Sequence, residues 1–411
     1  MADDGELMYV RERNLPYDVF DADNHMYENA DALTKFLPRE YEGLIKYVDI
    51  AGRTKLAIRD HITNYIPNPT FGRVAVPGVY GLDPTQKGDG ERGIPRGQRV
   101  RAMPGLDAFF DPEPRLELMA DMGIDRTLLW PTLASALEER LSDDPDAACV
   151  AVHALNEWMH EHWTFNFADA IFATPIISLA KLDAALAELE YIAERGAHIF
   201  LLRVAPVPTW KGLRSFALPE FDPFWERVQE LGLLVGMHAG DPGYTRFINE
   251  WEGVQREASF GHIGNPAFIA LMSPKDALID SMASIIGHGL ATRFPDLKFL
   301  PVEFGSTWIR PFVAKLQRTY ETSPVIFDED PFETFKRSIY IHAFHEPDPK
   351  GLLDIGLRAD HLMFGSDFPH PEGMADPLAY SEIVAELTPE DQQLIMGGTL
   401  RRLMGFEKAA A

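Results

Sequence analysis

Short β-rich runs alternate with helical stretches over most of this 411-residue chain. Such alternation predicts a parallel sheet whose strands are joined by crossover helices. The runs predict eight strands, at residues 17–23, 126–131, 171–177, 198–202, 233–238, 297–303, 338–342 and 361–367. Eight strand–helix units predict a TIM-like (β/α)8 barrel, a fold that a chain of this length can form as a single domain.

The connection between the first two expected strands is much longer than the others. We interpret residues 27–110 as an insertion in a single domain of residues 1–411. Residues 47–50 and 54–58 flank a glycine-containing turn, which predicts a β-hairpin. Residues 67–104 are rich in proline and glycine, a composition typical of a lid or a binding loop. Because the insertion leaves the carboxyl end of a strand, we expect it to lie over the active face.

Charge and cysteine content exclude several kinds of function. A formal charge of −25 argues against nucleic acid and membrane surfaces as partners, since both attract surplus Lys and Arg. Cys149 is the only cysteine, so neither an intrachain disulfide nor a thiolate zinc cluster can form. Any metal must therefore use histidine and carboxylate ligands. The N-terminal stretch has no secretory-signal pattern and no apolar run has membrane-spanning length, which predicts a cytoplasmic location.

Four of the expected strands end in residues that can bind a metal. Asp23 and His25 close the first strand, His238 the fifth, Glu303 the sixth and Asp367 the eighth. On an extended backbone, residues two apart point the same way, so Asp23 and His25 could share one ion. Taken singly, each residue has an ordinary structural explanation as a cap or a buried side chain. A barrel gathers its strand ends in one mouth, however, and carboxylates buried together there need a cation to offset their repulsion.

Longer motifs surround these residues. They are Asp21-x-Asp23-x-His25, residues 221–225 leading into 232–238, Arg293-Phe294-Pro295-Asp296-Leu297-Lys298, Gly365-Ser366-Asp367 and the final helix around 397–403. Together they resemble the amidohydrolase superfamily, specifically the amidohydrolase-2 group with its aminocarboxymuconate-semialdehyde decarboxylase and γ-resorcylate decarboxylase types. The resemblance covers most of the chain. It implies that His25, His238 and Asp367 hold a divalent ion, with Asp367 also placed for proton transfer.

Two positions depart from the familiar pattern of that group. Asp23 stands where the first histidine of an H-x-H pair is usual, and Glu303 stands where a catalytic histidine is often found. Carboxylates in place of imidazoles shift the ligand set toward oxygen, which brings manganese and iron into consideration beside zinc. We therefore expect one or two divalent ions per chain, with Asp23, His25, His238, Glu303 and Asp367 as candidate ligands.

Other polar residues allow more than one interpretation. His342, at the end of the seventh strand, and His345 could supply a missing acid or base, or could be satisfied core or surface histidines. We expect His370 to orient the turn after the eighth strand and His288 to be structural. Arg203 could meet a substrate carboxylate, although a structural ion pair is the stronger expectation.

The sequence thus predicts a metal-dependent hydrolase or carboxy-lyase that acts on a small organic acid, ester or amide. Asp367 would move a proton, and Glu303 or His342 would be a second acid or base. One alternative is a nonheme diiron oxygenase on the same barrel, with a bulky apolar or thioester substrate. Another is a barrel that only binds or assembles, which the intact metal-binding residues make the weakest. The expected partners are a small-molecule substrate and a second copy in a homodimer.

Overall fold

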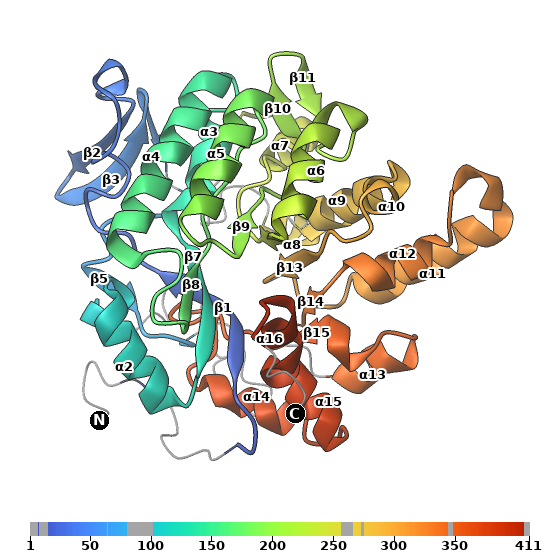
Figure 1. Ribbon diagram of the computed structural model, residues 1–411. Helices are drawn as coiled ribbons and strands as arrows, with labels where there is room; N and C mark the ends of the chain where they lie inside the picture. Colours follow the sequence, from blue (N-terminus) through green and yellow to red (C-terminus); the bar gives the residue numbers. More distant parts are fainter. Residues whose placement is uncertain are drawn as a thin grey trace.

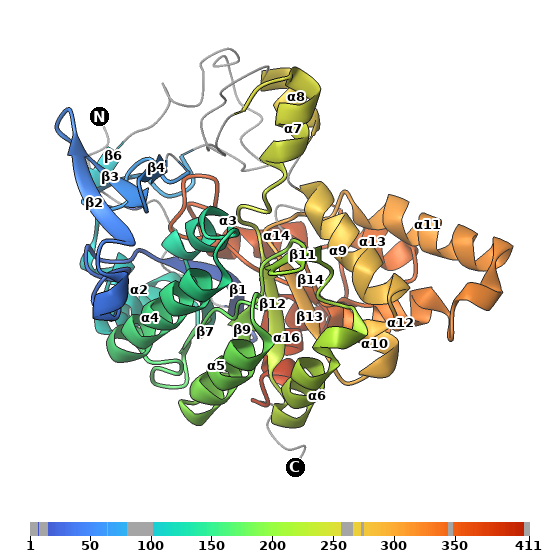
Figure 2. The same cartoon turned by 90° about the horizontal axis from the view of Figure 1, so that it is seen from above.

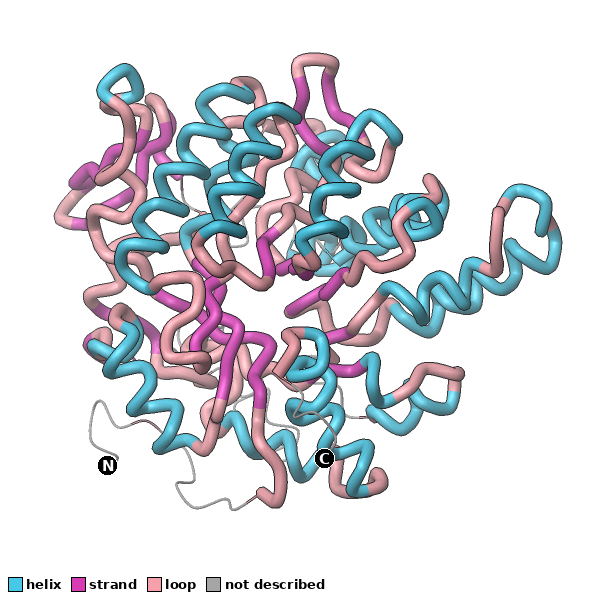
Figure 3. Tube along the Cα trace, viewed as in Figure 1, coloured by secondary structure: helices cyan, strands magenta, loops and turns pink. Residues whose placement is uncertain are grey.

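The computed structural model describes residues 7, 15–63, 65–79, 102–255, 266–272, 275–343 and 348–406. Strands lie in the middle of the molecule and most helices lie around them (Figures 1 and 3). The chain is therefore a mixed α/β protein. His345 and residues 80–101 of the predicted insertion lie outside the described residues.

All eight expected strands are present and pair in parallel. They are β1 (Phe20–Met26), β7 (Arg126–Pro131), β8 (Ile171–Ala173), β9 (Ile199–Leu201), β12 (Leu234–His238), β13 (Phe299–Val302), β14 (Ile341–His342) and β15 (Leu362–Met363). Their ladders have the orders β1–β7–β8, β9–β12–β13 and β14–β15. Isolated parallel bridges connect these ladders, from Ile176 to Leu201, from Phe299 to Ile339 and from Asn24 to Phe368.

Seven of the eight strands differ in extent from the prediction, and β1, β8 and β15 differ most. β1 covers residues 20–26 instead of 17–23. β8 ends at Ala173, shortly before Pro175, which has no N–H to donate to a ladder. β15 has two residues instead of seven, because the N–H of Phe364 bonds to the carbonyl oxygen of Ile395 and so leaves the ladder.

Helices cover the outside of the strands, as the view from above shows (Figure 2). Many start at a proline, and α2 ends at Gly123 in the left-handed conformation that favours glycine. The α-helices are α2 (Pro112–Met122), α3 (Leu137–Arg140), α4 (Pro145–Trp163), α5 (Leu182–Glu194), α6 (Asp222–Leu231), α7 (Thr245–Glu252), α8 (Pro266–Leu271), α9 (Lys275–Gly287), α10 (Leu290–Arg293), α11 (Ile309–Thr322), α12 (Pro331–Ser338), α13 (Pro349–Asp354), α14 (Tyr380–Ile383), α15 (Pro389–Gln393) and α16 (Thr399–Leu403).

Small antiparallel sheets lie outside the parallel ladders. Between β1 and β7, the predicted hairpin is formed by β2 (Ile45–Ile50) and β3 (Arg53–Ile58), and β4 (His61–Thr63) extends it. In the same segment, β5 (Arg73–Ala75) pairs with β6 (Ala102–Pro104). A further hairpin, β10 (Val207–Thr209) with β11 (Gly212–Arg214), follows β9. That residues 27–110 form an insertion over the active face stays a prediction.

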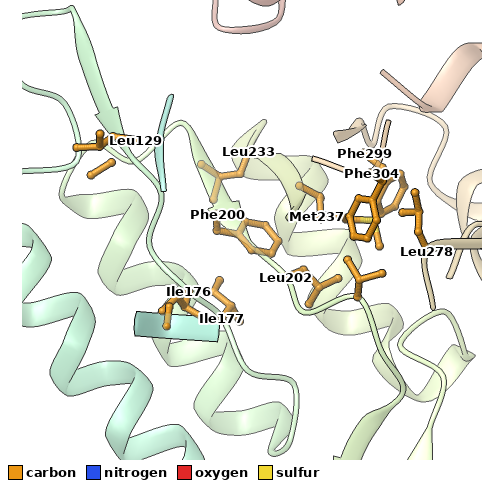
Figure 4. Packing of buried hydrophobic residues seen from close by; sticks show 14 of the residues in the cluster. Leu129, Ile176, Ile177, Phe200, Leu202, Leu233, Met237, Leu278, Phe299 and Phe304 are labelled. Carbon is orange, nitrogen blue, oxygen red and sulfur yellow. The ribbon is translucent and has the colours of Figure 1, made fainter. Parts of the chain in front are cut away.

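Buried apolar side chains form two clusters on the two sides of the strands. The outer cluster packs between strands and helices and includes Leu129, Phe200 and Phe299 (Figure 4). The inner apolar cluster comprises Phe20, Ala22, Leu128, Trp130, Phe172, Ile199, Leu234, Leu300, Val302, Tyr340, Met363, Leu400 and Met404. Leu128 and Trp130 of β7 face inward while Leu129 between them faces outward, as the two-residue period of a strand requires.

An extra residue in β1 changes which of its side chains face inward. Phe20 and Ala22 belong to the inner apolar cluster. The pairing with β7 then shifts, because Asp21 pairs with Thr127 whereas Asn24 pairs with Leu129. Such a bulge offsets the alternation by one position. Asp23 and His25 can therefore reach the same interior as Ala22.

Candidate metal centre

The structure brings Asp23, His25, His238 and Asp367 together near the carboxyl ends of β1, β12 and β15. Asp23 Oδ1 lies 3.1 Å from His238 Nε2 and 3.3 Å from His25 Nε2. His25 Nε2 also lies 3.4 Å from Asp367 Oδ1. The rings of His25 and His238 meet edge to face, with centroids 4.7 Å apart. All four side chains are buried, so the predicted convergence of these four residues is present.

The hydrogen bonding of this cluster is incomplete in a way that fits a cation. Asp23 Oδ2, Asp367 Oδ2 and both ring nitrogens of His25 are buried and have no hydrogen-bond partner among the described residues. A buried polar group left unsatisfied costs roughly 1–3 kcal/mol. A divalent ion would accept lone pairs from the two carboxylates and from one nitrogen of His25, and imidazole nitrogen with carboxylate oxygen suits manganese, iron or zinc.

Burial and neighbouring charges set the protonation states of the cluster. Burial raises the pKa of Asp367 well above its usual range, and the charges of Glu303 and Asp23 raise it further. Burial also opposes ionisation of Asp23, but its interactions with His238 and His25 outweigh burial and hold the pKa of Asp23 well below its usual range. Burial lowers the pKa of His25 to about 4. An ionised Asp23 beside a neutral His25 is the combination that binds a metal.

Glu303 lies at the edge of this cluster, where a carboxylate oxygen is 3.6 Å from His238 Nδ1. One ligand atom from each of Glu303, Asp367 and Glu372 lies within 4.8 Å of the others. The backbone of Glu303 has a φ of 68° and that of Asp367 a φ of 55°, values in the left-handed region. Non-glycine residues are held there where the surroundings constrain the backbone, often at functional sites. The ligand and acid/base roles of Glu303 stay predictions.

His342 points into the cluster from β14, but backbone groups engage its ring. Nδ1 accepts the N–H of Glu303 at 3.1 Å, and Nε2 lies 3.1 Å from the carbonyl oxygen of Gly365. Nδ1 is also 3.3 Å from Asp23 Oδ2. A ring held in this way positions the ends of β13 and β15. The predicted acid/base role of His342 would require one of these bonds to break.

The Gly-Ser-Asp motif at 365–367 joins the end of β15 to β1. A Cβ at Gly365 would lie 2.6 Å from the Cβ of Asp23, so only glycine allows this close approach. Ser366 donates to the Asp21 carboxylate from its hydroxyl at 2.5 Å and from its backbone N–H at 2.9 Å. Burial raises the pKa of Asp21 to about 7. Asp21 therefore connects β1 to the segment that follows β15, and Asp23, two residues further along β1, faces the cluster.

A buried arginine that the sequence analysis did not single out holds the end of β1. Arg115 of α2 is fully buried and donates to the carbonyl oxygen of His25 at 2.7 Å and to that of Ala108 at 2.5 Å. It also donates to the side chain of Asn24. Burial lowers the pKa of Arg115 to about 9. In the sequence it resembles any charged residue of a surface helix, so no local signal marks it.

Two residues with competing interpretations have structural contacts. Arg203 forms an ion pair with Glu139, and its Nε donates to the carbonyl oxygen of Asp241 at 3.1 Å. His288 is exposed, and its Nδ1 lies 3.1 Å from the hydroxyl of Ser215. Both arrangements agree with the structural alternative for these residues.

A cavity of about 40 Å³ adjoins His238. Its walls come from the segments that follow β7, β8, β9, β12 and β13, and they are mainly apolar with a few polar groups. Examples are Ile176, Val204 and Phe304 on the apolar side, with Ser135 and Arg203 among the polar groups. This composition resembles that of small-molecule sites, but the cavity itself has room for only a few water molecules.

Comparison with known proteins identifies the family. The amidohydrolase family model matches residues 65–406. This chain belongs to the amidohydrolase family. Its structure is similar to that of an amidohydrolase from Mycobacterium avium subsp. paratuberculosis K-10, with 32% identity, a TM-score of 0.87 and coverage of 95% of this chain and 100% of that one. No curated protein sequence matches it.

Amidohydrolase-superfamily decarboxylases are also similar in fold. One is a dihydroxybenzoic acid decarboxylase from Polaromonas sp. JS666 with bound manganese (14% identity, TM-score 0.58, 96% of this chain and 98% of that one). Another is 5-carboxyvanillate decarboxylase from Sphingomonas paucimobilis (15% identity, TM-score 0.54, 95% and 99%). The resemblance to the amidohydrolase-2 group is thus confirmed, and these findings give the oxygenase alternative no support. Among the described residues, no helix combines the length and the apolarity that crossing a membrane would need.

Proposed function

We propose that this amidohydrolase is a metal-dependent enzyme, a hydrolase or carboxy-lyase for a small organic acid, ester or amide. The observation that carries the proposal is the set of unpaired, buried ligand atoms on Asp23, His25 and Asp367. With His238, they would hold one divalent ion. A second ion would use Glu303, whose carboxylate clusters with those of Asp367 and Glu372.

We infer that the eight parallel strands close into a (β/α)8 barrel with this centre in its mouth. The bridges between the ladders and an inner apolar cluster drawn from β1 through β15 support this. Part of the segment between β1 and β7 packs against the site. The ring of Phe71 stacks on Tyr27 at 4.3 Å, and the N–H of Gly78 donates to the carbonyl oxygen of His370. These contacts support an insertion that covers the active face.

The bound ion would supply a Lewis acid that polarises a carbonyl or carboxylate oxygen of the substrate. Asp367 has two carboxylate oxygens, so it would bind the ion through the oxygen that has no hydrogen bond and move a proton through the other. That proton would go to the substrate carbon when CO₂ leaves, or to the leaving group in hydrolysis. Trp130 belongs to the inner apolar cluster, and its ring lies 5.0 Å from that of His238, so the site borders that cluster.

Metal content and turnover test this proposal together. Purified protein would be analysed for metals, loaded anaerobically with Mn²⁺, Zn²⁺ or Fe²⁺, and supplied with hydroxybenzoates, small esters and small amides. We expect one or two ions per chain, and CO₂ or free acid as product without O₂. A wild-type protein that takes up no divalent ion would contradict the proposal. Product formation that strictly consumes O₂ would contradict it as well.

A further inference from the structure

His370 lies within the candidate metal centre, although its sequence position suggests only a role in the turn after β15. Its Nδ1 lies 2.7 Å from Asp367 Oδ1. Its ring also lies against that of His25, with centroids 3.9 Å apart and planes 31° from parallel. One side chain therefore contacts two of the candidate ligands, one through a hydrogen bond and the other through its ring face.

The opposite side of the His370 ring is also fixed. Nε2 lies 3.3 Å from the hydroxyl of Thr132, and this hydroxyl is 2.8 Å from the carbonyl oxygen of Met26. The backbone carbonyl of His370 accepts the N–H of Gly78 at 3.1 Å. The imidazole is thus held by the ends of β1 and β7, and the backbone of His370 is held by the segment that contains Gly78.

This arrangement divides the two oxygens of Asp367 between two tasks. Oδ1 is engaged by His370, whereas Oδ2 is buried without a hydrogen-bond partner. An aspartate side chain has two rotatable bonds, and a hydrogen bond to one oxygen restricts both. Outer partners of this kind orient metal-binding carboxylates and imidazoles, and losing one typically weakens metal binding or activity about 10–100-fold.

We propose that His370 is a positioning residue of the metal centre. Together with Thr132, it fixes the Asp367 carboxylate and the His25 ring so that their free atoms face one ion. The inference rests on the proposed function. His370 belongs to a candidate ligand group with His25 and Asp367, but we assign it to positioning them, because its Nδ1 contacts Asp367 and its Nε2 contacts Thr132.

The test is Mn²⁺ affinity, measured by calorimetric titration of metal-free full-length protein. His370→Leu removes the hydrogen bond, whereas in His370→Asn the amide can donate to or accept from Asp367. Thr132→Val removes the hydroxyl that holds the ring. His288→Asn is the matched control, since His288 is exposed and outside this cluster. Circular dichroism and the melting temperature of each metal-free variant would show whether it folds.

We expect His370→Leu to weaken Mn²⁺ binding about 10–100-fold. The Mn²⁺ affinity of His370→Asn should stay within a few-fold of that of wild type, and that of Thr132→Val should lie between those of His370→Leu and His370→Asn. His288→Asn should bind Mn²⁺ as wild type does. If His370→Leu does not fold, His370→Asn and Thr132→Val still test the inference. Wild-type affinity in a folded His370→Leu, or equal losses in the Leu and Asn variants, would overturn it. Failure of the wild type to bind Mn²⁺ would instead overturn the proposed function, and this inference with it.

Discussion

Toward the amino ends of the parallel strands, Phe20 and Leu234 pack in the inner apolar cluster, whereas the carboxyl ends of the same two strands carry His25 and His238. Burying a large apolar side chain stabilises a fold by about 1.5–3 kcal/mol. The atoms left unpaired at the other end have the opposite effect until a cation binds them. The same strands thus support stability at one end and, in the proposed function, chemistry at the other.

Asp367→Asn should have the largest effect and should affect only the polar end. We expect turnover to fall about 10²–10⁴-fold, because the amide cannot exchange a proton and is a poor metal ligand. The free energy of unfolding of the metal-free protein should not fall, because the amide carries no charge to repel Asp23 and Glu303. Steady-state kinetics and chemical denaturation measure the two quantities. Near-normal turnover would contradict the proposal that the carboxyl ends of the strands carry the chemistry.

Phe172→Ala should have the reverse pattern at the apolar end. Phe172 is fully buried, and its ring lies 5.7 Å from that of Phe20. The cavity left behind should lower the free energy of unfolding by about 3–5 kcal/mol. Mn²⁺ affinity of the chains that remain folded should equal that of wild type. Phe172→Leu is the control and should lose less stability, and a large loss of Mn²⁺ affinity in either variant would show that the two ends are coupled.

Gly236→Ala changes β12 between its apolar amino end and its polar carboxyl end, and so tests whether one substitution there affects both stability and activity. A Cβ there would lie 2.3 Å from the ring of Trp130, which a hydrogen bond to the carbonyl oxygen of Ala22 holds in place. We expect a loss of about 1–3 kcal/mol in the free energy of unfolding. Activity should also fall, because His238 lies only two residues further along β12. Gly287→Ala is the control, since that glycine has open space around it.

Glu329→Gln should have the smallest effect, because its ion pair with Arg337 of α12 includes no candidate ligand and no residue of the inner apolar cluster. Hydrogen bonds from Arg337 lower the pKa of Glu329 from 4.5 to about 2. A lowered folded-state pKa stabilises the protein above pH 4.5, and this advantage disappears as the pH falls toward 2. The pair is partly exposed, so the variant should lose at most about 1 kcal/mol at neutral pH. Denaturation of both proteins across this pH range would measure how far the free energy of unfolding of the variant lies below that of wild type. This difference should become smaller as the pH falls.

The strands were predictable because each is a short apolar run between turn signals, and β7 has the predicted bounds. Asp23, His25, His238 and Asp367 were predictable as a group because parallel strands end on one side. The contact of His370 with Asp367 was not predictable, since it depends on a turn that brings residue 370 back onto residue 367. The burial of Arg115 depends on tertiary packing, which leaves no periodic pattern in the sequence.

The bulge in β1 also determines how tolerant this strand is to changes in length. Removing one residue between Asp21 and Asn24 would restore a regular ladder with β7, in which Asn24 still pairs with Leu129 and His25 with Trp130. Only one inward position would remain between Asp21 and Asn24, so the strand would lose either Ala22 from the inner apolar cluster or Asp23 from the candidate metal centre. Substitutions in this short stretch can be gradual in their effect, whereas a single-codon deletion would act as an all-or-none change.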